Sequence, residues 1–384
     1  MNCSEIFNKI DSLTQKYISV WEAACNIESP TDFKAGVDEC GSYLACIAKE
    51  FGCDVEIFKQ ETAGNVYCFT INKSSANQPI TLSGHIDTVH PVGTFGEPAV
   101  HIAGDKMFGP GVTDCKGGVI AAMQAMEALK ACGFTSRPVR LILQTDEETG
   151  SSTSGRATIN YMCESSKDSV AFLNLESISH NNEACIERKG IANFTLTVHG
   201  KEAHSAACAT MGASAILEAA HKVIELEKLK DADGLTCNCG VISGGTVPNT
   251  VPGYCEIKAN VRFATSEQLE WVKEHIRAVA DKVYVEGCET SVELTRLRVA
   301  MEYCDRNARL ANKINEILLS SGLDAVTVAK GKGGSDAAEI TEAGIPCIDC
   351  FGTKGSCIHS PNECGIISSL PEEEKRIAAV CAEI

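Results

Sequence analysis

The sequence predicts an α/β protein in which a mostly parallel sheet flanked by helices receives an inserted α+β domain of the ferredoxin-like type. Near-continuous apolar runs such as residues 139–143 are typical of strands buried on both faces, and they alternate with segments of helical periodicity. After residue 188 the pattern changes to apolar–polar alternation, which indicates half-exposed antiparallel strands. We therefore expect a discontinuous first domain, residues 1–187 and 298–384, and an inserted domain, residues 188–297.

The first domain begins with helical segments and two short strand-like runs, at residues 65–72 and 78–84. A helix is expected next, because apolar residues recur at helical spacing from residue 120 to 129 and Gly133 stands where a C-terminal cap belongs. Further strands are expected within residues 137–150, 169–177 and 345–351, and another helix near residues 307–319.

The inserted domain shows a β-α-β-β-α-β order. Alternating strands are expected within residues 188–200 and 253–263, and helices near residues 212–228 and 267–283. This order matches a split ferredoxin-like unit, in which two helices cover one face of a four-stranded sheet.

The amino-acid composition and net charge of the chain argue against some classes of binding partner. The chain has 384 residues, 51 acidic and 34 basic, with a formal net charge of -17, which argues against nucleic acid or an anionic membrane as a partner. No apolar stretch reaches the length of a membrane span, and the first residues lack a signal-peptide pattern, so we expect a cytoplasmic protein. The 21 cysteines are expected to be mostly buried, reduced thiols.

A histidine and a carboxylate lie two residues apart at the mouth of a buried strand. Strand periodicity directs His85 and Asp87 to the same side, so the Asp87 carboxylate is expected to accept the second ring N–H while the other nitrogen binds a metal. The alternative for an isolated pair is a loop histidine paired with a neighbouring acid.

Further ligand types follow other predicted elements. Asp114 precedes a helix, while Glu147, Glu148, Glu176 and His359 each follow a strand. The carboxyl ends of the strands meet at one edge of an open α/β sheet, so these side chains should converge there. Carboxylates and imidazoles crowded together require divalent cations, although each residue alone is compatible with a helix cap or a solvated strand end.

The Glu147–Glu148 pair carries the expected chemistry. In extended chain, consecutive residues point in opposite directions, so one glutamate would bind metal while the other takes a proton from water. Zinc lowers the pKa of bound water from about 16 to about 7, and two zinc ions can share a bridging hydroxide. The reaction class implied is hydrolysis of an amide bond.

The motifs together give a family resemblance that spans nearly the whole chain. The chain resembles the dinuclear-zinc exopeptidases and deacylases, which include glutamate carboxypeptidase, acetylornithine deacetylase, succinyl-diaminopimelate desuccinylase and aminoacylase. It is most similar to the glutamate carboxypeptidase branch. The motifs concerned are "SGHIDTV", "GPGVTDCKGG", "TDEETGSS", "NLES", "GKEAHS", "VPNTVPGYCEIKANVRF", "GGSDAAE" and "IHSPNE".

The resemblance implies a catalytic zinc-exopeptidase domain that holds two Zn²⁺ per chain, with Co²⁺ or Mn²⁺ as possible substitutes. His85 and Glu176 would be terminal ligands of one ion, Glu148 and His359 of the other, and Asp114 would bridge both. The resemblance also implies that Glu147 is the general base and that Asp87 orients His85.

The inserted domain would serve as a lid and as the surface of a homodimer. By the same resemblance, His204 would enter the partner's active site and stabilise the oxyanion, and Asn249, Arg262 and the backbone of Gly333, Gly334 and Ser335 would hold the substrate carboxylate. Lys330 or Lys332 stands where glutamate carboxypeptidases have an arginine. Because lysine lacks the bidentate fork, selectivity for C-terminal glutamate does not follow.

Three functions therefore remain open. The first is a carboxypeptidase or dipeptidase acting on small peptides, and the second is a deacylase of N-acyl amino acids. The third is a non-catalytic metal-binding or peptide-binding protein on the same scaffold, for which the loss of a ligand or of the base would be expected.

Overall fold

The computed structural model describes residues 3–230, 234–331 and 333–384. The chain divides into two compact units. The first comprises the chain up to Ile186 with Tyr303–Lys330 and Ser335–Ile384, and the second comprises Glu187–Glu302 with Gly331–Gly334. The second unit thus extends beyond residue 297 and includes a short glycine-rich piece, because Arg188 binds the backbone of both added segments: its N–H donates to Met301 O at 2.9 Å, and its Nη1 donates to Gly333 O at 3.2 Å.

A six-stranded mixed sheet forms the centre of the first unit. Its order is β1-β2-β6-β3-β7-β16. Strands β6, β3, β7 and β16 run parallel to one another. Strand β2 is antiparallel to both of its neighbours, β1 and β6. The bounds are β1 Asp54–Phe58, β2 Val66–Ile71, β3 Ile80–His85, β6 Val139–Gln144, β7 Ala171–Asn174 and β16 Cys347–Ile348.

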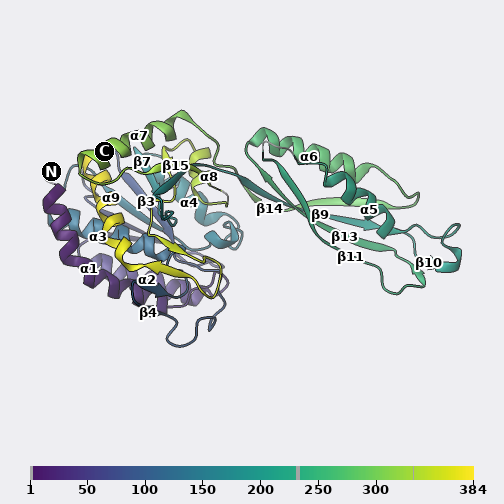
Figure 1. The fold of residues 1–384 in the computed structure, drawn as a ribbon, viewed down its shortest axis with the longest axis horizontal. Helices are drawn as coiled ribbons and strands as arrows, with labels where there is room; N and C mark the ends of the chain where they lie inside the picture. Colours follow the sequence, from purple (N-terminus) through teal and green to yellow (C-terminus); the bar gives the residue numbers. More distant parts are fainter. Residues whose placement is uncertain (1–2, 231–233, 332) are drawn as a thin grey trace. The chain divides into compact units, whose positions relative to one another are not determined.

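Helices flank this sheet, which confirms the predicted fold class. Helices α1, α3 and α9 pack against one another, and this brings the two ends of the described chain close together (Figure 1). Helix α3 is buried along almost its whole length, and Gly133, with φ of 77°, follows it as the expected cap. The bounds are α1 Cys3–Asn26, α2 Lys34–Glu50, α3 Lys116–Ala131, α4 Ala157–Ser166, α7 Asp305–Ser320, α8 Ala337–Glu342 and α9 Leu370–Glu383.

Close packing at the start of α3 needs glycine. A Cβ on Gly118 would lie 2.1 Å from the carbonyl oxygen of Leu175, and one on Gly117 would lie 2.3 Å from Thr353 Oγ1. These contacts let the first turn of α3 pack against the segment that follows β7. Asp114, two residues before that turn, and Glu176, the residue after Leu175, are predicted metal ligands, and this packing places them on neighbouring segments.

A second, four-stranded sheet of short strands was not expected from the sequence. Its order is β17-β18-β5-β4, with β4 at His101–Ala103, β5 at Lys106–Phe108, β17 at Gly355–Ser356 and β18 at Cys364–Ile366. It pairs segments some 250 residues apart and so joins the loop before α3 to the loop between β17 and β18. A two-stranded sheet pairs β8, Glu183–Arg188, with β15, Thr327–Gly331.

The second unit has the predicted β-α-β-β-α-β order. Its antiparallel sheet has the order β11-β13-β9-β14, and α5 and α6 lie along one face of it (Figure 1). Side chains of β9 and β13 alternate between buried and partly exposed, as their apolar–polar alternation predicted. The bounds are β9 Gly190–His199, β10 Ala203–His204, α5 Ala215–Leu226, β11 Thr236–Gly244, β12 Thr250–Val251, β13 Tyr254–Phe263, α6 Ser266–Asp281 and β14 Glu289–Arg298.

Within the described residues, no helix is long and apolar enough to cross a membrane. All 21 cysteines are free thiols, and twelve of them are buried, in agreement with their interpretation as small core residues.

Candidate active site

The five predicted metal ligands meet at one edge of the central sheet. His85 is the last residue of β3, Glu148 follows β6, and Glu176 follows β7. These strands are parallel neighbours, so their carboxyl ends lie side by side. Asp114 lies two residues before the start of α3, and His359 lies in the loop between β17 and β18.

Asp114 lies between the two histidines. Its Oδ1 is 3.0 Å from His85 Nε2, and its Oδ2 is 3.1 Å from His359 Nε2. The second imidazole is also 3.2 Å from Glu148 Oε2, and His85 Nε2 is 3.7 Å from Glu176 Oε1. Each oxygen of one carboxylate therefore faces a different imidazole, which is the arrangement of a carboxylate that bridges two cations.

The donor set fits divalent metal ions. Ligand atoms of His85, Asp114 and Glu148 lie within 4.8 Å of one another. Two imidazoles and three carboxylates are ligand types that zinc accepts, and the burial of the three carboxylates would be costly without a neutralising cation. The set therefore has the composition and spacing of a dinuclear site.

The pKa values of these groups reflect the crowding of acids and imidazoles. Hydrogen bonds to Asp114 and Glu148 raise the pKa of His359 to about 10. Burial raises the pKa of Glu148 to about 7 and holds that of Glu176 well above its usual value. Burial also opposes ionisation of Asp114, but its hydrogen bonds to His359 and His85 outweigh burial and lower its pKa.

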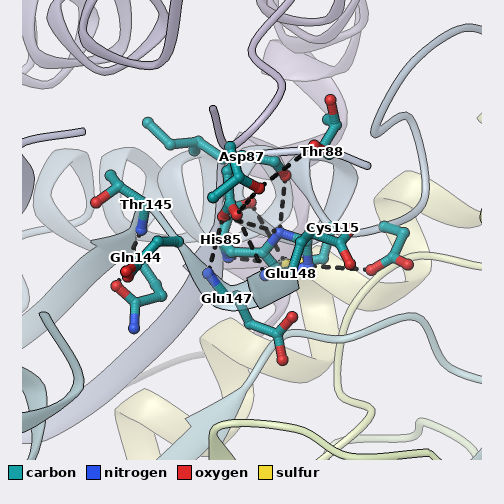
Figure 2. A network of polar contacts seen from close by, with 12 residues as sticks. His85, Asp87, Thr88, Cys115, Gln144, Thr145, Glu147 and Glu148 are labelled. Carbon is teal, nitrogen blue, oxygen red and sulfur yellow. Dashed lines mark hydrogen bonds and ion pairs between the residues drawn. The ribbon is translucent and has the colours of Figure 1, made fainter. Parts of the chain in front are cut away.

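Asp87 connects His85 to the turn after β6 (Figure 2). The nearest acceptor for His85 Nδ1 is the Asp87 backbone carbonyl, at 2.9 Å, while the carboxylate lies 3.5 Å away. The carboxylate instead accepts hydrogen bonds from the Thr31 hydroxyl at 2.7 Å and from the backbone N–H groups of Glu147 and Glu148, both at 3.2 Å. Asp87 thus holds the histidine through its carbonyl oxygen and the turn through its side chain.

The Glu147–Glu148 pair differs from the sequence expectation in one respect. The two residues lie in a 3₁₀ helix, Glu147–Thr149, and not in extended chain, because β6 ends at Gln144. The helical turn, and not strand alternation, separates their side chains. Glu148 belongs to a group of possible ligands, whereas Glu147 belongs to neither such group found among the described residues.

Glu363 is a functional residue that the sequence did not reveal. This buried carboxylate accepts hydrogen bonds from the backbone N–H groups of Gly111, Thr113 and Asp114, at 3.0 to 3.3 Å, and lies 2.8 Å from His90 Nε2. It fixes the loop that carries Asp114 to the chain segment that carries His359. Its position in "IHSPNE", four residues after the histidine, was the only sequence signal.

Cys115 was also missed as a neighbour of the metal ligands. Its sulfur, with His85 and Glu176, forms a second group of possible ligand atoms. The His85 backbone N–H donates to Cys115 Sγ at 3.0 Å, and burial raises the pKa of this thiol. A buried thiol that keeps its proton is a poor metal ligand, so we interpret Cys115 as part of the packing beneath the site.

Three predicted residues lie in the second unit. His204 is exposed at the end of β10, which pairs with β12, and the N–H of Ser205 donates to Asn249 O at 2.9 Å. These contacts bring His204 and Asn249, which are 45 residues apart in the sequence, close together in space. Arg262 lies on β13, where its Nε donates to Asn260 Oδ1 at 3.3 Å.

The predicted glycine-rich segment follows β15, which contains Lys330. Gly333 accepts a hydrogen bond from Arg188, and Asn174, at the end of β7, donates to Ser335 Oγ at 2.9 Å. A guanidinium group therefore lies beside this segment even though lysine stands in the family's arginine position. Lys332, the alternative to Lys330, lies outside the described residues.

Known proteins share sequence similarity with most of the chain. Carboxypeptidase G2 from Pseudomonas sp. (strain RS-16) is 27% identical over 361 residues, which cover 92% of this chain and 86% of that protein. Succinyl-diaminopimelate desuccinylase from Wolbachia pipientis wMel is 27% identical over 384 residues, which cover 94% of this chain and 90% of that protein.

Solved structures share the fold. Aminopeptidase PepT from Bacillus cereus has a TM-score of 0.77 at 21% identity and covers 96% of this chain and 98% of its own. A dinuclear metal-binding peptidase from Bacillus subtilis has a TM-score of 0.72 at 16% identity, with coverage of 97% and 98%.

The family assignment rests on the sequence profile. Residues 81–383 match peptidase family M20/M25/M40, and this range contains all five candidate ligands and Glu147. The match confirms the resemblance expected from the motifs and disfavours unrelated chemistry at this site. The chain belongs to peptidase family M20/M25/M40 and is a hydrolase of amide bonds.

Proposed function

We propose that this chain is a dinuclear zinc exopeptidase of the carboxypeptidase or dipeptidase kind, which hydrolyses an amide bond next to a free carboxylate. The observation that carries the proposal is the position of Asp114, whose two oxygens lie 3.0 Å and 3.1 Å from two different imidazoles. One carboxylate between two histidines supports a pair of ions sharing a bridging ligand.

Zinc bound at this site would supply Lewis acidity, which polarises the substrate carbonyl and makes water more acidic. His85, Glu176, Glu148 and His359 would hold the ions, with Asp114 between them. Glu147 would accept a proton from the attacking water as the new C–O bond forms, and it would give that proton to the amine nitrogen as the C–N bond breaks. Its place beside a candidate ligand, in the same 3₁₀ turn, supports this role.

Residues of the second unit would complete the reaction. His204 would donate a hydrogen bond to the oxyanion in the active site of a partner subunit, so the working enzyme would be a homodimer. Asn249, Arg262 and the segment from Gly333 to Ser335 would bind the substrate carboxylate, with Lys330 nearby. The family resemblance supports these roles, and we propose the cytoplasm as the location because of the reduced cysteines.

A deacylase of N-acyl amino acids is the second candidate. The desuccinylase and the carboxypeptidase relatives have the same identity to this chain, 27%, so similarity alone favours neither substrate class. Both reactions would use the same metal ligands and the same base, and they differ in the group on the acyl side of the bond.

A substrate panel tests the proposal. Metal-loaded protein and a chelated control are incubated with dipeptides, N-acetyl amino acids and N-succinyl amino acids, and the products are identified by mass spectrometry. We expect chelator-sensitive release of free amino acids from dipeptides. Release from the N-acyl compounds alone would favour the deacylase, and no release with two metals verified per chain would favour a non-catalytic binding protein.

A further inference from the structure

A groove in the first unit lies next to the candidate metal ligand Glu148. Its volume of about 620 Å³ falls within the range of about 300–1,000 Å³ that is usual for small-molecule sites. Glu148 and Thr149 form one part of its wall, and the groove is therefore continuous with the candidate active site. The remaining lining residues come from two loops: Pro30, Thr31, Asp32, Phe33, Thr88, Val89, Pro91 and Val92.

The lining is apolar and acidic. Phe33, Val89 and Val92 are 45%, 39% and 58% exposed, so apolar surface is available to a ligand. Among the lining residues, all of which the structure describes, the charged side chains are Asp32 and Glu148. Glu148 is a candidate zinc ligand, so bound ions would neutralise its charge, and Asp32 is the other charged side chain. The lining residues therefore offer a negatively charged group no cationic side chain to pair with.

The two loops are fixed to each other and to the catalytic turn. Thr31 N–H donates to Thr88 O at 3.1 Å, and Thr88 N–H donates to Ser29 O at 2.9 Å. The Thr31 hydroxyl also donates to the carboxylate of Asp87, which holds the backbone of Glu148. The groove is therefore largely pre-formed, and a group bound in it would have a defined position relative to the base and the metal ligands.

The position of the Phe33 ring depends on Gly36, in the first turn of α2. A Cβ on Gly36 would lie 2.6 Å from Cδ1 of Phe33, so the ring occupies space that any larger residue would take. The ring is held there by the loop, since Phe33 N–H donates to Pro30 O at 2.8 Å. Phe33 is thus a fixed apolar wall of the groove.

We propose that this groove binds the acyl-side group of the substrate and selects an apolar, non-anionic group. The inference rests on the proposed function, in which the amine side of the cleaved bond carries the carboxylate. The lining residues include no cationic side chain to pair with that carboxylate, so the groove takes the other side of the bond. It follows that an apolar aminoacyl group is a better substrate than a succinyl group, which separates the two substrate classes that sequence similarity leaves together.

The test compares substrates that share one C-terminal residue and differ in the acyl group: leucyl, glycyl and succinyl. For the wild type we expect kcat/KM to fall in that order. Phe33→Ala and the nearly isosteric Val92→Thr should each lower kcat/KM for the leucyl substrate about tenfold, the effect of losing an apolar contact. The glycyl substrate, which has no side chain to place in the groove, should change by less than about twofold.

Two further variants control the experiment. Leu319→Ala removes an apolar side chain that is 63% exposed on α7, outside the groove, and should leave all three values unchanged. Asp32→Asn removes a negative charge and should raise kcat/KM for the succinyl substrate selectively. Metal content measured on each variant separates loss of the groove from loss of the metal site.

The outcomes distinguish this inference from the function on which it rests. If the wild type hydrolyses the panel but prefers the succinyl substrate, or if Phe33→Ala lowers the leucyl and glycyl values equally, the groove does not select the acyl group. If the wild type with two metals hydrolyses none of the three, the proposed function itself is overturned and the groove assignment falls with it.

Discussion

Asp87 is a residue whose contacts link His85, Thr31 and the Glu147–Glu148 turn. Its carboxylate accepts from Thr31 and from the two N–H groups of the Glu147–Glu148 turn, and its carbonyl oxygen faces His85 Nδ1. An asparagine at this position would have one acceptor oxygen and would direct N–H groups toward N–H donors. The turn that carries Glu147 and Glu148 would lose its alignment, while the backbone carbonyl that faces His85 would remain.

Asp87→Asn is therefore expected to reduce kcat about 10–100-fold, the usual effect of removing a residue that orients metal ligands. The measurement is steady-state kinetics on the substrate that the panel identifies, with metal content determined on the same samples. Asp168→Asn, which alters an exposed ion pair with Arg140, serves as the matched control. Activity of Asp87→Asn within about twofold of the wild type would show that these contacts do not matter for the reaction.

The site residues that the sequence predicted are recognisable because they are metal-ligand types and lie at the ends of predicted strands. His85, Glu148 and Glu176 follow apolar strands, so their convergence was predictable from the rule that parallel strands end at one edge. Glu363 acts by accepting backbone hydrogen bonds from a loop some 250 residues away, and no local pattern encodes that pairing. The same holds for the apolar loops of the groove, since a valine in a loop has no spacing that marks it as exposed.

Helix α3 begins with a buried lysine. Lys116 Nζ donates to the carbonyl oxygens of Ala24 and Ile27, at 3.0 Å and 2.9 Å, and so caps the C-terminal end of α1. Positive charge at a helix C-terminus is favourable, and apart from Lys116 the Ala24 carbonyl oxygen has the thiol of Cys40 at 3.7 Å as a weak donor. The contact also fixes the start of α3, two residues after Asp114.

Lys116→Met should lower the free energy of unfolding by about 1–3 kcal/mol, because it removes a charged hydrogen-bond donor from two carbonyl groups. Denaturant unfolding of the metal-free protein measures this effect. Lys130, in the last turn of the same helix, donates to Gly52 O at the surface, so Lys130→Met should cost less than about 0.5 kcal/mol. Equal effects of the two substitutions would contradict the capping role.

Helix α9 contains a buried carboxyl group. Within the described residues neither oxygen of Glu374 has a hydrogen-bond partner, and burial raises its pKa well above 4.5. The folded protein therefore holds a proton on Glu374 that the unfolded chain releases above about pH 4.5. Stability must fall as pH rises from that value toward the pKa of the folded state.

Glu374→Gln removes this ionisation and should raise Tm at pH 8, with a gain that shrinks as pH approaches 4.5. Each kcal/mol recovered corresponds to a rise of about 2–4 °C for a unit of this size. Thermal unfolding of the metal-free protein across this pH range provides the measurement, with Glu50→Gln on the exposed end of α2 as control. A difference in Tm that does not vary with pH would refute the buried-proton explanation.

A helix or strand was predictable from the sequence when its apolar periodicity extends over enough residues to be visible. Helices α5 and α6 lie within about two or three residues of the expected bounds, since Ser214 and Thr265 accept hydrogen bonds from Leu217 N and Gln268 N and thereby fix their starts. Strands β4, β5, β17 and β18 have two or three residues each, too few for any periodicity to be visible. The 3₁₀ turn at Glu147 was missed because the apolar run gives no sign of where the strand ends.

At the scale of the whole molecule, the proposed homodimer requires an association surface, and the second unit has an exposed apolar edge. Strand β11 is an edge strand of its sheet, and Val241 and Ile242 on it are exposed, as is Ile224 on α5. An exposed edge strand with apolar side chains favours association with another chain. This supports the proposed dimer and the role of His204 in a partner's site.

Ile242→Asp is expected to shift the protein from dimer to monomer in sedimentation velocity experiments, because a buried unpaired charge would oppose association. Leu319→Ala in the first unit should leave the sedimentation coefficient unchanged. If the wild type is a dimer and Ile242→Asp remains one at all concentrations, β11 is not the interface.

The first unit and the second unit were both foreseeable in outline, because hydrophobic patterning changes where the inserted sheet begins. The exact boundaries were not, since Gly331–Gly334 joins the second unit through hydrogen bonds from Arg188 that only the folded chain brings about. The central claim, however, depends on the first unit alone: two divalent ions bridged by Asp114, with Glu147 moving the proton.

Metal titration of chelated protein, followed by turnover measurements at each point, tests that claim most directly. We predict that wild type and Glu147→Gln each bind two zinc ions per chain, that Glu147→Gln loses about 10²–10⁴-fold in kcat, and that Asp114→Asn no longer binds two. Turnover by Glu147→Gln at the wild-type rate, or two tightly bound ions in Asp114→Asn, would contradict the account.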